Sequence, residues 1–374
     1  MTKIRSFFIK WHRYSPVFTM VTALLIPFTL VTHILSICIP AVSDFINRYP
    51  AAGVRFLLAK LTGFFPFSLA ETVILLVIPL AVGGFFLARR LEKREDPKGA
   101  YYFLSYLVGF LCLMYTLFVF TLGTAYFGTP MDEELGLDRE KVSAEELYET
   151  AEAILERIDG VIDEIEFDEN GASVMPMTRK ELNRELNTLA KKAAEKYPFL
   201  SSLSSRVKPI LLSKPMTYTH MSGIYTYLTG EANINTNFPD STIPFTMAHE
   251  MSHQRGIARE DEANFAALLI SMESDDPYIL YSAYYELFKY FINALAVADT
   301  QLFEAIYQKA DPRLVGEIYA FNDFFDKYAD NLAADITGGL NDAYQQIQGV
   351  EEGIASYGLV VDLAVAYYKA NGRI

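Results

Sequence analysis

The stretch His249-Glu250-Met251-Ser252-His253 has the residue types and the spacing of a zinc site. Residues four apart on an α-helix share one face, one turn apart, so the two imidazoles can bind a single metal ion. Zinc lowers the pKa of a bound water towards about 7, and the neighbouring glutamate can take its proton. The stretch predicts one Zn²⁺ per chain, held by His249 and His253, with Glu250 as the general base of a hydrolase.

A catalytic zinc ion normally has three protein ligands and one open position, so a third ligand is expected. A helix that starts near residue 258 puts Glu260 and Asn264 on one face, one turn apart. Glu260 is the predicted third ligand, and Asn264 is predicted to orient a ligand histidine. Glu262 lies about 200° from Glu260 around such a helix and is kept as the substitute ligand. Alternatively, these acids are only helix-start residues that the helix dipole favours.

The flanking residues mark both ends of the helix that carries the histidines. Asp240, Ser241 and Thr242 are N-cap candidates, and Pro244 falls in the first turn, where a missing N–H costs little. Gly256 follows as a helix terminator. The sequence therefore predicts a complete helix around the metal site.

Residues 223–229 and 231–237 are rich in β-branched and aromatic side chains, which predicts two short strands upstream of that helix. If the second is an edge strand, Asn233 and Asn235 are placed to bind an extended peptide; an ordinary internal strand is the alternative. His220 is a further substrate-binding candidate. Peptide hydrolysis also needs a donor for the oxyanion, and the candidates are His220, Tyr225 and Tyr281.

Three runs are long and apolar enough to cross a bilayer core of about 30 Å, which takes about 20 helical residues. They are residues 17–39, 69–88 and 101–127. A cleavable signal peptide is the alternative for the first run, but no small-residue cleavage pattern follows it. In the apolar run 278–298, Glu286, Lys289 and Asn293 favour a buried core helix over a fourth span.

Charge divides the chain near residue 128. Residues 1–128 hold 12 Lys and Arg against five acids, a net charge of +7, which leaves 20 basic and 41 acidic residues, net −21, for 129–374. Basic clusters at the N-terminus and at residues 89–94 favour the cytoplasmic side, so residues 129–374 are expected outside the cell membrane. Residues 51–66 then form an outer interfacial helix. Such an acidic domain excludes nucleic-acid binding.

The remaining patterns set the fold class. Ser143 with Glu146 and Thr178 with Glu181 form capping boxes, which predict helices over 143–167 and 178–197. The two cysteines lie in apolar runs, which excludes a disulfide framework and a cysteine metal site. We expect a multi-span α-helical membrane region (1–128) followed by a mainly helical α+β, zincin-like domain with a small sheet (129–374).

Residues 223–265, above all Pro244-Phe245-Thr246-Met247-Ala248-His249-Glu250-Met251-Ser252-His253-Gln254-Arg255-Gly256 and Glu260-Asp261-Glu262-Ala263-Asn264-Phe265, resemble a bacterial membrane-protein family, the domain of unknown function 3810. That family pairs N-terminal spans with a zinc-peptidase-like H-E-x-x-H domain. More distantly, Glu260-x-x-Ala263-Asn264 resembles the ligand helix of gluzincin peptidases, which implies Glu260 as third ligand. The interval from His253 is shorter than in gluzincins, and the metzincin ligand position holds Arg259, which cannot bind zinc.

These patterns and the resemblance predict a membrane-anchored zinc metalloendopeptidase that hydrolyses envelope or secreted polypeptides. Its partners are then a polypeptide substrate and the lipid bilayer. The alternative is a non-proteolytic membrane sensor or scaffold with a structural zinc site. A transporter is disfavoured because the three apolar runs contain few ionisable residues, chiefly His33 and Glu71.

Overall fold

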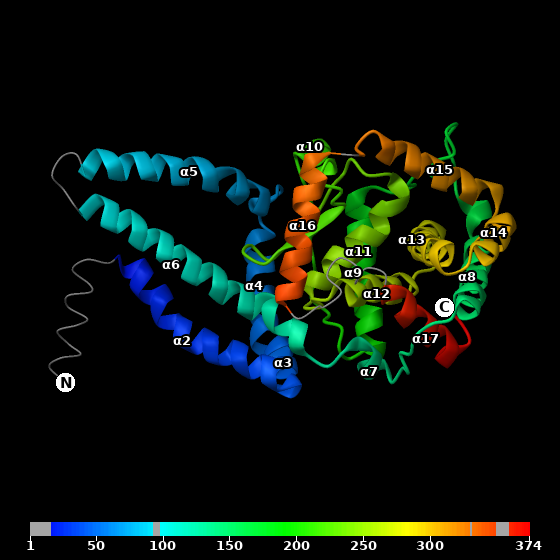
Figure 1. The fold of residues 1–374 in the computed structure, drawn as a ribbon, viewed down its shortest axis with the longest axis horizontal. Helices are drawn as coiled ribbons and strands as arrows, with labels where there is room; N and C mark the ends of the chain where they lie inside the picture. The colour runs from blue at the N-terminus through cyan, green and yellow to red at the C-terminus, as the bar shows by residue number, and fades with distance from the viewer. Residues whose placement is uncertain (1–15, 93–97, 330, 349–358) are drawn as a thin grey trace.

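The structure is a computed structural model that describes residues 16–92, 98–329, 331–348 and 359–374. Three long helices project from one side of a mainly helical body, and the C-terminus lies on that body (Figure 1).

The α-helices are α2 (Val17–Cys38), α3 (Pro40–Ile46), α4 (Ala52–Thr62), α5 (Leu69–Glu92), α6 (Lys98–Thr121), α7 (Met131–Leu135), α8 (Ala144–Asp159), α9 (Arg179–Lys196), α10 (Ser213–Thr217), α11 (Ile243–Gln254), α12 (Glu260–Ser271), α13 (Pro277–Ala298), α14 (Thr300–Lys309), α15 (Pro312–Asp326), α16 (Leu332–Ile347) and α17 (Leu359–Asn371). The strands and short helices are β1 (Lys208–Pro209), β2 (Gly223–Thr226), β3 (Glu231–Ile234), the π-helix η1 (Asn47–Ala51), and the 3-10 helices η2 (Gly123–Phe127), η3 (Ile162–Glu164) and η4 (Asp240–Thr242).

The three projecting helices, α2, α5 and α6, are each long and apolar enough to cross a membrane. Only 22%, 6% and 17% of their apolar windows are buried, so most of their side chains face outward, as the side chains of lipid-facing helices do. The third helix is shorter than the predicted 101–127. It ends at Thr121, and the 3-10 helix η2 begins at Gly123, where a Cβ atom would meet the Phe118 ring.

The small sheet has the order β1–β3–β2, with β1 parallel and β2 antiparallel to β3. Of the two alternatives for residues 231–237, the structure has the ordinary internal strand and not the edge strand, because β3 is the central strand. Asn233 and Asn235 are fully buried. The Asn233 amide donates to the carbonyl of Ile224, and the Asn235 amide to the carbonyl of Met221, so both hold neighbouring chain in place rather than facing a substrate.

The core of the body is built around α13. Its tyrosine and phenylalanine side chains, all but Tyr290 buried, belong to the main apolar cluster, and the helix packs against α8, α11 and α14. This confirms the expected core helix in place of a fourth span. Both predicted capping boxes are also present, at Ser143 for α8 and at Thr178 for α9.

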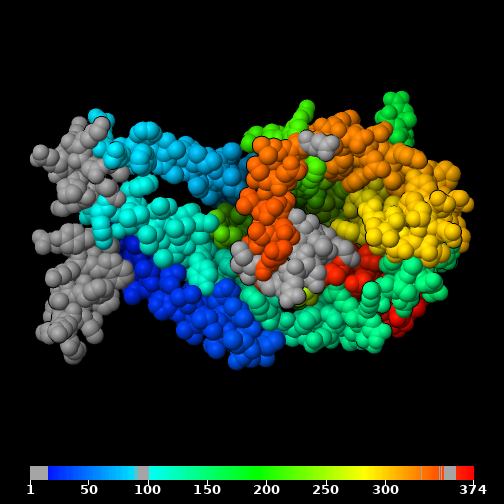
Figure 2. Space-filling view, viewed as in Figure 1, coloured from blue at the N-terminus to red at the C-terminus, as the bar shows by residue number. Residues whose placement is uncertain are grey.

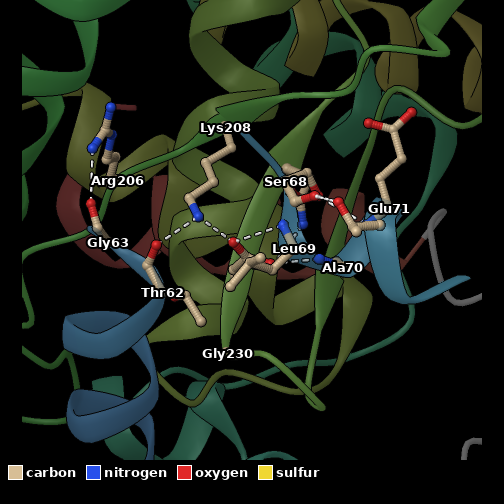
Figure 3. Close-up of polar contacts among 12 residues, drawn as sticks. Thr62, Gly63, Ser68, Leu69, Ala70, Glu71, Arg206, Lys208 and Gly230 are labelled. Atoms are coloured by element: carbon tan, nitrogen blue, oxygen red, sulfur yellow. Dashed lines mark hydrogen bonds and ion pairs between the residues drawn. The ribbon is translucent and has the colours of Figure 1, made fainter. Parts of the chain in front are cut away.

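A buried ion pair between Lys208 and Glu231 joins the sheet to the helix α5. The Glu231 carboxylate accepts hydrogen bonds from the backbone N–H groups of Leu69 (3.2 Å) and Ala70 (2.7 Å), at the first turn of α5. The Lys208 ammonium also donates to the carbonyl of Thr62, 2.8 Å away at the end of α4, as Figure 3 shows. We call Lys208, Glu231 and these backbone groups the α5 clamp.

In a second contact the carboxylate belongs to α5 and the backbone N–H groups belong to the segment after β1. The Glu71 carboxylate of α5 accepts the N–H groups of Leu211 (2.9 Å) and Leu212 (2.8 Å), which follow β1. Arg206 in turn donates to the carbonyl of Gly63, 2.8 Å away (Figure 3). The segments on either side of residue 128 are therefore joined by the buried α5 clamp and by these more exposed hydrogen bonds, in addition to the chain connection between α6 and α7.

Candidate metal centre

Helix α11 carries His249, Glu250 and His253, and it begins and ends near the predicted positions. Pro244 lies in its first turn, where the absent N–H leaves no bond unmade. The predicted N-cap does not form, because the hydroxyl of Thr242 bonds back to the carbonyl of Pro239. The N–H of Phe245 is satisfied instead by the Ser282 hydroxyl of α13, 3.2 Å away.

The turn after α11 is fixed by residues that precede α5. Gly256 has φ +100°, a conformation that favours glycine, and a Cβ there would lie 2.6 Å from the Oδ1 atom of Asn47. The Asn47 amide donates to the carbonyl of Gly256 (3.0 Å). Arg55, buried in α4, donates to Asn47 Oδ1 (2.8 Å) and to the carbonyl of Thr121 (2.9 Å) at the end of α6. The chain between the first two long helices therefore supports the end of the histidine helix.

Helix α12 starts at Glu260 and brings its carboxylate to the two histidines. The two Nε2 atoms are 3.0 Å apart, and Glu260 Oε2 lies 3.2 Å from the Nε2 of His249 and 3.4 Å from that of His253. Four ligands arranged as a tetrahedron at about 2.0–2.1 Å from zinc are about 3.3 Å from one another. The three donor atoms therefore already have the mutual spacing that a tetrahedral zinc ion requires.

The hydrogen bonds of the imidazoles also suit a metal. His253 Nδ1 lies 2.8 Å from the carbonyl of Ile257, so this nitrogen holds the proton in the neutral imidazole, the form in which Nε2 has a lone pair for a metal. His249 Nδ1 is buried and makes no hydrogen bond within the described part of the chain. Asn264, predicted to orient a ligand histidine, lies beside His249 and donates to the hydroxyl of Tyr290, 3.3 Å away.

The electrostatics of the cluster reflect several charges in a buried space. Burial opposes ionisation of Glu260, but the His253 charge and hydrogen bonds from both histidines outweigh it and hold the carboxyl pKa well below its usual range. Burial would lower the pKa of His253, yet Glu260 and then Glu250 raise it to about 9. Burial raises the pKa of Glu250 to about 8. A divalent cation in the cluster would lower both values, because it favours the anionic carboxyl and the neutral imidazole.

Gly223, at the start of β2, lies directly against Glu250, and sequence reasoning missed it. A Cβ at this position would be 2.5 Å from Glu250 Oε1, so the close approach of strand and carboxylate requires glycine. Glu250 Oε2 is buried without a hydrogen-bond partner. A glycine within a predicted strand was the available signal, because such glycines often mark close backbone approaches.

The other predicted residues have partners outside the group of three donor atoms. Glu262, the substitute ligand, accepts a hydrogen bond from the N–H of Met131 (2.9 Å) and does not join the cluster. His220 is exposed, and its Nε2 contacts the carbonyl of Tyr328 (2.9 Å). Tyr281 is buried in the body and donates to Glu317 (3.3 Å), and Tyr225 is buried beside Arg55.

Helix α16 adds a residue that no local sequence pattern indicated. Burial raises the pKa of Tyr344 to about 12, and the nearby Glu260 charge adds to the shift. Its hydroxyl accepts a hydrogen bond from Tyr126 (3.3 Å), and its ring packs edge-on against Phe118 of α6. One side chain thus lies between the metal cluster and the end of a long apolar helix.

The fold and the site define a mainly helical protein with three membrane-length apolar helices and a largely buried His–His–Glu cluster able to hold a metal ion. The chain belongs to the family described as proteins of unknown function, DUF3810, whose model matches residues 49–365. The match runs from just before α4 into α17 and includes His249, His253 and Glu260. Searches of curated proteins and of solved structures found no match.

Proposed function

We propose that this protein is a membrane-anchored zinc metalloendopeptidase whose body lies outside the cell membrane and hydrolyses envelope or secreted polypeptides. The observation that carries the proposal is the convergence of His249, His253 and Glu260 at 3.0–3.4 Å, with Glu250 one residue from the first ligand. The three apolar helices and the basic N-terminus support a multi-pass topology with a cytoplasmic N-terminus.

In this mechanism His249, His253 and Glu260 would hold one Zn²⁺. A bound zinc ion would supply a Lewis acid that polarises a peptide carbonyl and makes water more acidic. Glu250 accepts the proton of the attacking water, a role that fits a carboxylate with one oxygen free of protein partners. The Ile257 carbonyl keeps His253 in the tautomer whose Nε2 is free for the metal.

The outer edge of β2 is the better candidate for holding substrate, in place of β3. The bond from Asn235 N–H to the Ser222 carbonyl and the antiparallel register point the backbone groups of residues 222, 224 and 226 towards β3. Those of Gly223 and Tyr225 then point to the free edge. An extended peptide that pairs there lies next to Glu250, because Gly223 touches that side chain.

Metal analysis of the purified protein, combined with cleavage of a quenched fluorescent peptide library, tests this function. Wild type is expected to contain one zinc per chain and to lose cleavage with a chelator. Glu250→Gln should keep zinc and lose cleavage by about 100-fold or more. Glu260→Gln should lose zinc, whereas Glu262→Gln, the matched control in the same helix, should keep it. Full activity in Glu250→Gln would overturn the mechanism.

The competing function is a zinc-binding sensor or scaffold without proteolysis. The observation that favours it is the tyrosine Tyr344 of α16, which is close enough to Glu260 for the carboxylate charge to raise its pKa. Zinc binding that depends on Glu260, together with no cleavage by wild type at any pH, would select this alternative.

A further inference from the structure

Large apolar side chains are exposed on the body mainly in two segments. Of the nine exposed ones described from residue 129 onward, five lie in the loop after β1 and on α16, and they include Leu211 (87% exposed) and Leu332 (72%). The others in the two segments are Leu212, Ile336 and Leu340, and the remaining four are Val174, Tyr218, Val297 and Tyr319. Single exposed apolar residues are ordinary, but clusters mark a surface that binds something.

Both segments lie level with the outer ends of the long apolar helices. The N–H groups of Leu211 and Leu212 bond to Glu71 in the first turn of α5. Tyr344 of α16 packs against Phe118 in the last turn of α6, with ring centroids 6.2 Å apart. If α5 and α6 span a bilayer, these contacts place both segments at its outer surface.

The segment that precedes α5 also exposes large apolar side chains near the outer ends of the long helices. Phe64 (75% exposed) and Phe67 (50%) lie just before α5, and Phe56 (58%) and Leu61 (53%) lie on α4. Arg55 ties α4 to the carbonyl of Thr121, at the end of α6. The exposed apolar residues of the body are thus continuous with an apolar segment at the ends of the long helices.

Helix α16 has the form of a helix that lies on a membrane surface. Leu332, Ile336 and Leu340 are spaced by four residues and form one stripe, whereas Asp335 and Asp342 lie about 100° or more from its centre. Figure 1 shows α16 running across the direction of α5 and α6, and Figure 2 shows it on the surface between those helices and the rest of the body.

Exposed cations accompany this surface. Lys60 lies on α4, Arg206 precedes β1, and Lys214 lies on α10, immediately after the exposed leucines. Cations at this level attract the phosphates of anionic lipid headgroups, although the body as a whole is acidic. Continuity with the long helices, the apolar stripe and these cations together select a lipid leaflet as the occupant.

We propose that the loop at Leu211 and Leu212 and the apolar stripe of α16 insert into the outer leaflet, so that the body rests on the bilayer surface. The inference uses the topology of the proposed function, in which α2, α5 and α6 are spans. It is independent of zinc and of peptide hydrolysis. We call the Leu211–Leu212 loop and the α16 stripe the leaflet surface.

Depth measurements on the full chain in liposomes test the proposal. Cys38 and Cys112 are replaced by alanine, and single cysteines at Leu211 or Leu340 are labelled with an environment-sensitive fluorophore. Ile78 (70% exposed, within α5) is the control for a span, and Val297 (91% exposed, at the end of α13) is the control for an apolar residue in water. Vesicles of phosphatidylcholine and phosphatidylglycerol are prepared with and without brominated acyl chains, which quench by contact.

The labels at Leu211 and Leu340 are expected to shift to blue and to lose emission in brominated vesicles, by less than the label at Ile78, while the label at Val297 keeps its emission. If Ile78 is quenched but Leu211 and Leu340 behave like Val297, the leaflet surface is wrong and the topology stands. If Ile78 is not quenched, the topology itself fails. A blue shift without quenching means that protein, such as a second copy, covers the surface, which also overturns the proposal.

Discussion

The metal cluster and the α5 clamp both bury several charged groups, but only the clamp is internally satisfied. Each Glu231 oxygen has a partner, and the Lys208 ammonium binds both Glu231 and a carbonyl. In the cluster, the two histidine Nε2 atoms and a Glu260 carboxylate oxygen lie 3.0–3.4 Å from one another, and Glu250 Oε2 beside them has no hydrogen-bond partner within the described residues. Buried polar groups that are left unsatisfied are costly, so this arrangement is one that a bound cation would stabilise.

Breaking the clamp should give the largest loss of stability. Glu231→Gln leaves the Lys208 charge buried without its counter-ion, which costs about 3–5 kcal/mol. We expect a much lower melting temperature in detergent, or no folded protein. The double variant Lys208→Met with Glu231→Leu should recover most of the loss, because no lone charge remains. If the single variant melts like wild type, the clamp does not hold α5 to the sheet.

Removing zinc should give the next largest effect. A ligand that binds only the folded state stabilises it by about 2.7 kcal/mol when its free concentration is 100 times its Kd. Chelation should therefore lower the melting temperature of wild type, and zinc should restore it, as differential scanning fluorimetry can measure. Glu260→Gln should be insensitive to both treatments. A chelator effect of equal size in Glu260→Gln would place the metal elsewhere.

In the zinc-free protein, Glu250→Gln should increase stability, opposite in sign to the clamp variant. Burial raises the pKa of Glu250 from about 4.5 to about 8, so the folded state binds its proton more tightly than the unfolded state. The carboxyl therefore costs stability as pH rises from about 4.5 to about 8. We expect a gain on the order of 1–3 kcal/mol at pH 8 that disappears near pH 4.5. Denaturant titrations at both pH values, with chelator, measure it.

A surface ion pair should show almost no effect. Lys196 and Glu273 are 2.7 Å apart, but the lysine side chain is 61% exposed. Lys196→Ala should cost at most about 1 kcal/mol and should not respond to zinc. If Lys196→Ala lost as much stability as Glu231→Gln, burial would not explain which charged side chains contribute most to the stability of the fold.

Local patterns predicted most of the elements and the core of the site. The capping boxes at Ser143 and Thr178, the glycine stop at Gly256 and the four-residue histidine spacing are encoded within one or two helical turns. Because Glu260 and Glu262 lie about 200° apart on one helix, only one of them could reach the histidines. In the structure Glu260 is the one that lies beside His249 and His253. These predictions required no long-range information.

The failures involve contacts between distant parts of the chain. The pairing of Lys208 with Asn233 makes β3 a central strand, and no pattern within residues 231–237 reveals a partner more than 20 residues upstream. The same applies to the placement of Tyr344 near Glu260 and of Arg55 near Gly256. The available signal was an arginine, Arg55, between two apolar runs, because a charge near a membrane needs partners.

The contacts of Asn47 and Arg55 with the Gly256 turn bear on how the protein can be divided. A fragment that starts at residue 129 would lose these side chains and also the Leu69 and Ala70 N–H groups that bind Glu231. The turn after its histidine helix would lose the Asn47 and Arg55 contacts, and Lys208 and Glu231 would be exposed to solvent where α4 and α5 now cover them. The smallest fragment that keeps these contacts therefore begins at or before Asn47, and because it contains α5 and α6 we expect it to require detergent or lipid.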